Sequence, residues 1–287
     1  MSGAVAVTVP ASSANLGAGF DVLGMGLDLR LEAGTGAAPD GARSVDVHHP
    51  AAIAFDALGG SGTIWLRSPI PMGRGLGFSG AARVAGASLA AAQRSPEDPQ
   101  GAIAAARDEI LAVTSALEGH GDNVAASVCG GVVAWVAGRA LELRVGPQLA
   151  SASVIAWIPD VTTATDRSRA ELGADVARTD VVHSLGRLAQ FVVAVEHDDP
   201  AVLVGATDDR LHQPSRLPLV PGAAAAIHAG VGAGAWCGWL SGSGPTVALL
   251  CPSRSAASVV AALPSGGRSK VLHIADRGVE VTAPRPH

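Results

Sequence analysis

The pattern of apolar and polar positions predicts strands and helices in both halves of the chain. Residues 4–10 alternate small and β-branched side chains, which is typical of a strand. Residues 79–93 and 101–117, separated by the break "SPEDPQ", are rich in small and apolar side chains and predict two helices. The remaining expected elements are a second strand after the glycines within 11–33, strands at 63–71, 152–160, 235–251 and 269–276, helices at 180–199 and 221–234, and a short helix or turn leading to a strand within 124–136.

Strands and helices mixed in this way indicate an α+β fold class. The 287 residues are enough for one large domain or two of ordinary size. We place a boundary near residue 150, which gives predicted domains at 1–150 and 151–287.

Composition and charge then narrow the classes of function. The chain is 48% hydrophobic and 16% charged, as expected of a globular protein, and its net charge of −5 without a basic block argues against a nucleic-acid partner. The N-terminus lacks the basic region of a signal peptide, and the most apolar stretch, 124–138, is too short to span a bilayer. We therefore expect a cytoplasmic protein with no membrane partner. The three widely spaced cysteines predict buried thiols and not a metal site.

A glycine-rich loop, "PMGRGLGFSGA", joins the strand predicted at 63–71 to the helix predicted at 79–93. Glycines at 73, 75, 77 and 80 allow positive φ and a close approach to a ligand, and the following helix start offers unpaired N–H groups to an anion. The loop is not a Walker A motif, because Phe78 and Ser79 stand where lysine is required. A tight turn without a ligand is the alternative interpretation.

Further loops favour a shared site. "PASSANLGAGFD" (residues 10–21) ends in a carboxylate, "EGHGDN" (118–123) gathers four polar side chains, and "SGSGPT" (241–246) is again rich in glycine. Loops of this kind, brought together by the fold, are a common way to build a binding site.

These motifs resemble those of a known family. "VPASSANLGAGFDVLGMGL", "PIPMGRGLGFSGAA" and "LSGSGPTVALL" are similar to the three motifs of the GHMP small-molecule kinases. "SANLGAGFD", "EGHGDNVAASVCGG" and "LHQPSRLPLVPG" resemble the homoserine kinases among them. The resemblance implies a two-domain GHMP kinase architecture, with an N-terminal domain like domain 2 of ribosomal protein S5 and a ferredoxin-like C-terminal domain.

The resemblance also implies binding of ATP with Mg²⁺. Ser79 matches a serine whose hydroxyl reaches the metal, and the partner carboxylate is Glu118 or Glu109, with Glu118 preferred for its proximity to the loop. Phe78 departs from the family's serine, and Gly80 replaces the usual alanine, which we expect to make room for Phe78. The implied ATP-binding residues are Pro71, Met72, Gly73, Arg74, Gly75, Leu76, Gly77, Phe78, Ser79, Gly80 and Ala81.

The substrate implied is L-homoserine, whose hydroxyl would receive the γ-phosphoryl group in threonine biosynthesis. Asn15 and Asp21 would hold the amino acid, Asp21 at its ammonium group, although both side chains could instead cap turns. His120 and Asn123 would lie near the reacting hydroxyl, and His120 could also be structural.

Two arginines complete the implied substrate site. Arg169 and Arg216 would grip the α-carboxylate, with Arg167 as an alternative to Arg169. The catalytic set is therefore Asn123, Asp122, Arg169 and Ser79. Asp122 is either a general base or a cap of the next segment; without a base, the proton would pass to phosphate late in the reaction.

Two other functions stay open at this point. The chain could be a GHMP kinase for another small hydroxy acid or alcohol, since Phe78 and the short stretch between the first two motifs depart from the family. It could also be a homologue that binds a metabolite without turnover. The resemblance further implies that the chain can form a homodimer.

Overall fold

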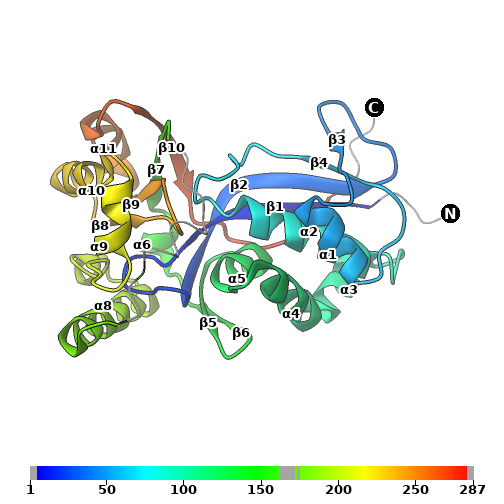
Figure 1. Ribbon diagram of the computed structural model, residues 1–287, viewed down its shortest axis with the longest axis horizontal. Coiled ribbons are helices and arrows are strands. Elements are labelled where there is room, and N and C mark those ends of the chain that lie inside the picture. Colours follow the sequence, from blue (N-terminus) through cyan, green and yellow to red (C-terminus); the bar gives the residue numbers. More distant parts are fainter. Residues whose placement is uncertain (1–4, 162–171, 173–174, 283–287) are drawn as a thin grey trace.

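The computed structural model describes residues 5–161, 172 and 175–282 (Figure 1). Its larger sheet has the order β11-β1-β2-β4-β3, and β5, which pairs with β2, forms a hairpin with β6. All of these pairs are antiparallel. The strands are β1 (Ala6–Ala14), β2 (Leu23–Thr35), β3 (Arg43–Ser44), β4 (Ile64–Arg67), β5 (Val132–Val136), β6 (Arg139–Leu143) and β11 (Glu280–Thr282).

A layer of helices covers this sheet, as Figure 1 shows below β1 and β2. Its centre is α2 (Phe78–Ala92), which is buried along almost its whole length. Small side chains permit this: a Cβ on Gly86 would lie 1.9 Å from the carbonyl oxygen of Ala51, so the neighbouring helix crosses α2 at backbone contact. The other helices of the layer are α1 (Pro50–Ala57), α3 (Pro99–Ala105), α4 (Arg107–Glu118) and α5 (Asp122–Cys129).

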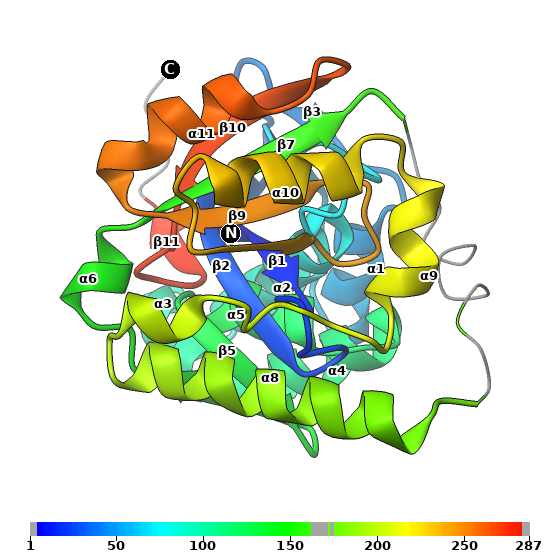
Figure 2. The same ribbon diagram turned by 90° about the vertical axis from the view of Figure 1, so that its left-hand side faces the viewer.

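The second sheet is formed by later strands in the order β10-β7-β9-β8, again all antiparallel. Figure 2 shows α10 and α11 in front of it and α8 along the lower edge of the molecule. The strands are β7 (Ser153–Pro159), β8 (Cys237–Leu240), β9 (Val247–Cys251) and β10 (Gly267–His273). The helices are α6 (Pro147–Ala150), α8 (Arg178–Glu196), η1 (Pro200–Leu203), α9 (Gln213–Arg216), η2 (Leu217–Leu219), α10 (Ala223–Gly232), η3 (Ser253–Ser255) and α11 (Ala256–Ala262).

Some elements differ from the sequence-based predictions. The predicted loop at 10–21 begins as strand, because β1 continues to Ala14 and pairs with β2 past a register shift at Pro10 and Ala11. The helix predicted at 101–117 is divided at Ala106 into α3 and α4. The strand predicted at 63–71 covers only Ile64–Arg67.

The end of the described chain returns to the first sheet. β11 pairs with β1, with Ala6 opposite Thr282. The predicted domain 151–287 therefore contributes one strand to the sheet of the predicted domain 1–150. β10 of the second sheet is thus followed in the chain by a strand of the first sheet.

Two of the three cysteines, Cys237 and Cys251, are buried, as the sequence predicts. Burial raises the pKa of Cys237 to about 12 and that of Cys251 to about 11, so both thiols stay protonated near neutral pH.

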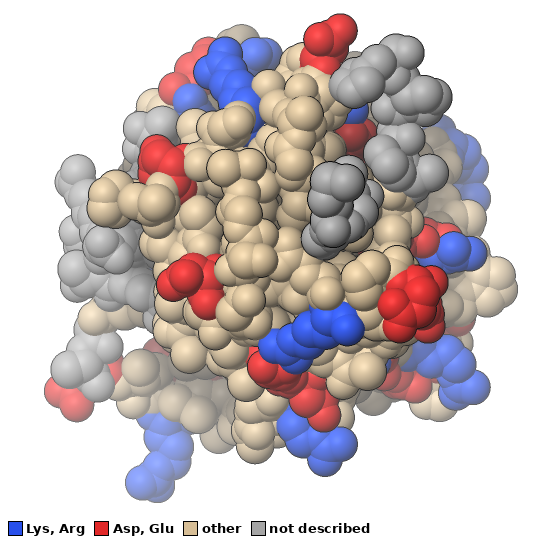
Figure 3. Space-filling view, turned by 90° about the vertical axis from the view of Figure 1, so that its right-hand side faces the viewer, with Lys and Arg blue, Asp and Glu red and all other residues tan. Residues whose placement is uncertain are grey.

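On the face in Figure 3, acidic and basic side chains of the described residues are interspersed among uncharged ones. Across the described part of the chain, none of the helices combines the length and the apolar character needed to span a bilayer.

Candidate active site

The glycine-rich loop has a backbone that only glycine adopts easily. Gly73, Gly75 and Gly77 have φ values of 64°, 72° and 69°. A Cβ on Gly75 would lie 2.3 Å from the carbonyl oxygen of Ser241, and one on Gly77 would lie 2.0 Å from Oγ of Ser12. The glycines therefore serve the contacts of this loop with the other two loops as well as its conformation.

The glycine-rich loop leads directly into the start of α2. Gly77 precedes the helix without a side-chain hydrogen bond to cap it, and the first turn contains no acidic residue. The first N–H groups of a 15-residue helix thus point toward the loop with the positive end of the helix dipole behind them. Phe78 packs edge-on against His49, with ring centroids 6.1 Å apart. The unpaired N–H groups at the start of α2 are suited to phosphate oxygens and need no lysine beside them.

Gly80 does not make room for Phe78, contrary to expectation. The nearest atoms to a Cβ added there belong to Asn123 and Val124, at 3.5–3.7 Å. Those are ordinary van der Waals distances, and alanine would fit.

Ser79 and Glu118 meet beside the helix start. The Ser79 hydroxyl donates to Oε2 of Glu118 at 2.8 Å, and the same oxygen accepts from Nε of Arg83 at 2.6 Å. Glu109, the alternative carboxylate, instead forms an exposed ion pair with Arg94 on another part of the surface. The geometry therefore favours Glu118 as the carboxylate that faces the loop.

The start of α5 carries the polar residues of the "EGHGDN" segment. It sits close to β2, because Gly24 has no side chain: a Cβ there would lie 2.3 Å from the carbonyl oxygen of Asp122. Oδ1 of Asp122 accepts from the backbone N–H of Asn123 at 2.8 Å and lies 2.9 Å from Nδ1 of His120. Oδ1 of Asn123 accepts from the Ser12 hydroxyl at 3.0 Å. The side-chain nitrogen of Asn123, Nδ2, is therefore the group of this residue that can donate a hydrogen bond to a ligand.

The loop after β1 is held in a left-handed conformation at three non-glycine residues. Asn15, Leu16 and Asp21 have φ values of 69°, 45° and 55°. The Asn15 side chain stabilises this shape, since its Oδ1 accepts from the N–H of Asp21 at 3.0 Å and its Nδ2 donates to the carbonyl oxygen of Gly242 at 2.9 Å. Asn15 therefore shapes the site and links two loops, and Asp21 follows at its rim.

A buried chain of hydrogen bonds joins the three loops. The carbonyl oxygen of Gly75 can only accept, so the Ser241 hydroxyl donates to it at 2.6 Å. Ser13 must then donate to Ser241 at 2.7 Å, and it accepts from Nε1 of Trp239 at 2.9 Å. The order of donors is fixed from Trp239 to Gly75, which makes the junction a rigid unit.

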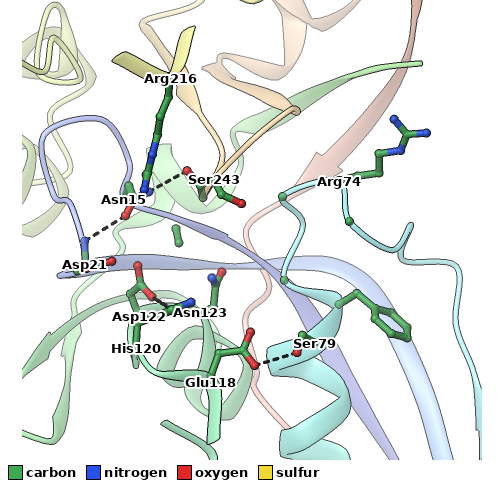
Figure 4. A pocket seen from close by; sticks show the side chains of 16 residues that line it. Asn15, Asp21, Arg74, Ser79, Glu118, His120, Asp122, Asn123, Arg216 and Ser243 are labelled. Atoms are coloured by element: carbon green, nitrogen blue, oxygen red, sulfur yellow. Dashed lines mark hydrogen bonds and ion pairs between the residues drawn. The ribbon is translucent and has the colours of Figure 1, made fainter. Parts of the chain in front are cut away.

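These elements enclose one cleft, seen in Figure 4. Asp21 and Arg216 lie at one side of it, Ser79 and Glu118 at the other, and Asn123 between them. Arg74 is directed away, and its guanidinium donates to the carbonyl oxygens of Pro159, at 3.0 Å, and of Val161. The lining residues are Ala14, Asn15, Asp21, Gly73, Arg74, Gly75, Gly77, Phe78, Ser79, Glu118, His120, Asp122, Asn123, Arg216, Gly242 and Ser243.

Most of the predicted site residues thus lie together, with some exceptions. Arg169 and its alternative Arg167 fall outside the described residues. Pro71, Met72, Leu76, Gly80 and Ala81 do not line the cleft, and Leu76 and Ala81 are buried in the core. The sequence-based prediction did not include Ser12, Ser13 or Arg83. The two serines lie within a quoted motif, and Arg83 directly follows another.

Comparison with known proteins decides the family. Residues 47–131 match the GHMP kinases N terminal domain, and residues 194–269 match the GHMP kinases C terminal domain. The chain belongs to the GHMP kinase family. This confirms the resemblance seen in the motifs and the expected fold, and it supports a kinase that uses ATP.

Relatives of this GHMP kinase have similar length. A homoserine kinase of Thermus thermophilus is 35% identical over 286 residues, which covers 93% of this chain and 95% of that protein. A homoserine kinase of Desulfitobacterium hafniense is 35% identical over 277 residues, which covers 90% of this chain and 91% of that protein. The crystal structure of a homoserine kinase from Cytophaga hutchinsonii shares the fold with a TM-score of 0.80 at 23% identity and covers 97% of each chain.

Proposed function

We propose that this GHMP kinase transfers the γ-phosphoryl group of ATP to the side-chain hydroxyl of L-homoserine. One observation carries the proposal: a single cleft has the start of α2, which is suited to anions, at one side and a carboxylate and an arginine, Asp21 and Arg216, at the other. An amino acid has an ammonium and a carboxylate group that complement this pair. The relatives named homoserine kinase support the same acceptor.

Different residues of the cleft hold the ATP phosphates, orient the acceptor and contact the reacting oxygen. Loop Gly73–Gly77 and the first N–H groups of α2 hold the ATP phosphates and stabilise their negative charge. Asp21 and Arg216 orient the acceptor, and the Asn123 amide nitrogen donates to the reacting oxygen or the moving phosphoryl group. The acceptor oxygen forms a bond to the γ-phosphorus while the bond from that phosphorus to the bridging oxygen of ADP breaks.

The acceptor's proton leaves by one of two routes. Oδ1 of Asp122 already accepts the Asn123 N–H and lies next to His120. This supports a positioning role for Asp122, with the proton passing to the transferred phosphoryl group. Direct removal of the proton by Asp122 is the competing route.

Glu118 and Ser79 fit a magnesium ion. Both present oxygen, the ligand that Mg²⁺ prefers, and both lie beside the proposed phosphate site. Arg83 takes Oε2 of Glu118, which leaves Oε1 as the second carboxylate oxygen for a metal. When bound, Mg²⁺ would neutralise charge on the ATP phosphates.

The homodimer and the cytoplasmic location expected from the sequence stay predictions.

The proposal is tested by ADP release with ATP and Mg²⁺ against a panel of L-homoserine, L-threonine, L-serine, pantoate and mevalonate. Strong turnover on L-homoserine supports it. Preference for another alcohol refutes the acceptor but keeps the phosphate site. ATP binding without turnover on any acceptor refutes the kinase activity. Arg216→Gln removes the positive charge proposed to bind the carboxylate of the acceptor. We expect this variant to raise the KM for L-homoserine and to leave the KM for ATP unchanged.

A further inference from the structure

Arg216 is held by a buried aromatic cluster that the proposed chemistry does not use. His212 is fully buried and Arg216 is only 2% exposed. The His212 ring stacks on Phe20, with centroids 5.1 Å apart and planes at 26°. The Arg216 guanidinium lies over the face of the same Phe20 ring, 5.1 Å from its centroid. A charged group is thus packed on the Phe20 ring and beside the His212 ring at the edge of the cleft.

The hydrogen bonds of His212 fix its protonation state. Its Nε2 lies 2.8 Å from the carbonyl oxygen of Gly17, which can only accept, so Nε2 carries the proton. Its Nδ1 lies 3.3 Å from NH1 of Arg216, which can only donate, so Nδ1 is an acceptor. A doubly protonated imidazole could not make both contacts, and the ring is neutral.

The surroundings of His212 support the neutral form. Burial is the largest cause that lowers its pKa, and the positive charge of Arg216 lowers it further. Asp209 and Asp21 oppose this, as does the hydrogen bond to Gly17. Asp209 is itself occupied, since its Oδ2 accepts the backbone N–H groups of His212 and Gln213, each at 2.8 Å.

The cluster ties Arg216 to the loop that bears Asp21. Phe20 precedes Asp21 directly, and the Gly17 carbonyl that accepts from His212 belongs to the same loop. His212 therefore contacts both the guanidinium and the loop. The ring therefore helps to fix the position of the arginine relative to the loop that bears the carboxylate.

We propose that His212 is a positioning residue that sets selectivity for acceptors with an α-carboxylate. It does so by accepting a hydrogen bond from Arg216 while it anchors the loop of Asp21. This inference rests on the proposed function, in which Arg216 binds that carboxylate. Without the acceptor at Nδ1, the guanidinium keeps its charge but loses its orientation, and selectivity for a carboxylate over a neutral group falls.

A matched pair of substitutions separates the two contacts of the ring. His212→Asn keeps an acceptor near the position of Nδ1, and His212→Gln keeps a donor near the position of Nε2. The assay compares kcat/KM for L-homoserine with that for L-homoserinamide, which lacks the carboxylate charge, and records the KM for ATP. His228→Gln, at an exposed position on α10, is the control.

We expect His212→Gln to lower the preference for L-homoserine over its amide about ten- to hundredfold, as for loss of one hydrogen bond to a charged group. The KM for ATP should not change, and His212→Asn should retain most of the preference. Equal losses for both acceptors, or equal behaviour of the Asn and Gln variants, would overturn the inference. If neither variant folds, the ¹⁵N NMR signals of His212 in the unmodified chain and in Arg216→Gln decide the inference, as described next.

Failure of the proposed function gives a different result. In that case the unmodified chain shows no turnover on L-homoserine. The ¹⁵N NMR signals of His212 then decide the inference without turnover: we expect a neutral ring protonated at Nε2, with an Nδ1 signal that shifts in Arg216→Gln. A ring protonated at Nδ1, or an Nδ1 signal that ignores Arg216, overturns it.

Discussion

Replacing Ser241 with alanine tests whether the three loops form one rigid junction. The substitution removes two hydrogen bonds, the one accepted from Ser13 and the one donated to the carbonyl oxygen of Gly75. Ser13 and Ser241 are both fully buried, so water does not replace the lost partner. Leaving a buried polar group unsatisfied costs about 1–3 kcal/mol.

We therefore expect Ser241→Ala to lower the free energy of unfolding by about 2–3 kcal/mol, the upper part of that range, because a donor and an acceptor both lose their partner. At about 2–4 °C per kcal/mol for a chain of this order of size, the melting temperature falls by roughly 4–12 °C. The KM for ATP should also rise, since Gly75 is part of the glycine-rich loop.

Denaturant unfolding and ATP kinetics measure the two effects. Ser115→Ala is the control, because the hydroxyl of this half-buried serine donates to the carbonyl oxygen of Ala112 within α4, and we expect a change below about 0.5 kcal/mol in the free energy of unfolding. The double variant Ser13→Ala with Ser241→Ala should lose less than the sum of the single losses, because the two hydroxyls share one bond. A stability of Ser241→Ala equal to the control, or additive losses, would refute the rigid junction.

Three further predictions concern the cleft and the helix start beside it. Glu118→Gln should raise the Mg²⁺ concentration for half-maximal activity more than about tenfold, while Glu109→Gln, in its exposed ion pair, should not; equal responses in a Mg²⁺ titration would contradict the metal assignment. Asp122→Asn should lower kcat less than about tenfold, whereas a loss near 10²–10⁴-fold would establish Asp122 as the general base. Gly80→Ala should fold with a gain of about 0.5–1 kcal/mol in denaturant unfolding, because the added methyl meets its neighbours at 3.5–3.7 Å; a loss of stability would show a tighter site.

The glycine-rich loop and α2 could be predicted because their signals are local. Alternating glycines followed by a run of small apolar residues determine both the turn and the buried helix. The "EGHGDN" segment was equally clear, because its polar residues stand together before an apolar run. Its place beside the phosphate loop was implied by family resemblance and not by spacing.

Other features depend on partners far along the chain. Ser12 and Ser13 look like loop residues, yet they end a buried strand because Asn123 and Ser241 satisfy their hydroxyls. His212 gives no local sign that it will face Gly17, which lies 195 positions earlier. Such roles arise only when the chain is folded, and a periodic pattern does not encode them.

The proposed reaction transfers a phosphoryl group from ATP to an amino-acid hydroxyl in the cleft. The most direct measurement is ³¹P NMR of the chain with ATP, Mg²⁺ and L-homoserine. We expect a phosphomonoester signal that grows in step with ADP and is absent when L-homoserine is omitted. Inorganic phosphate in place of that signal, or no loss of ATP, would contradict the claim.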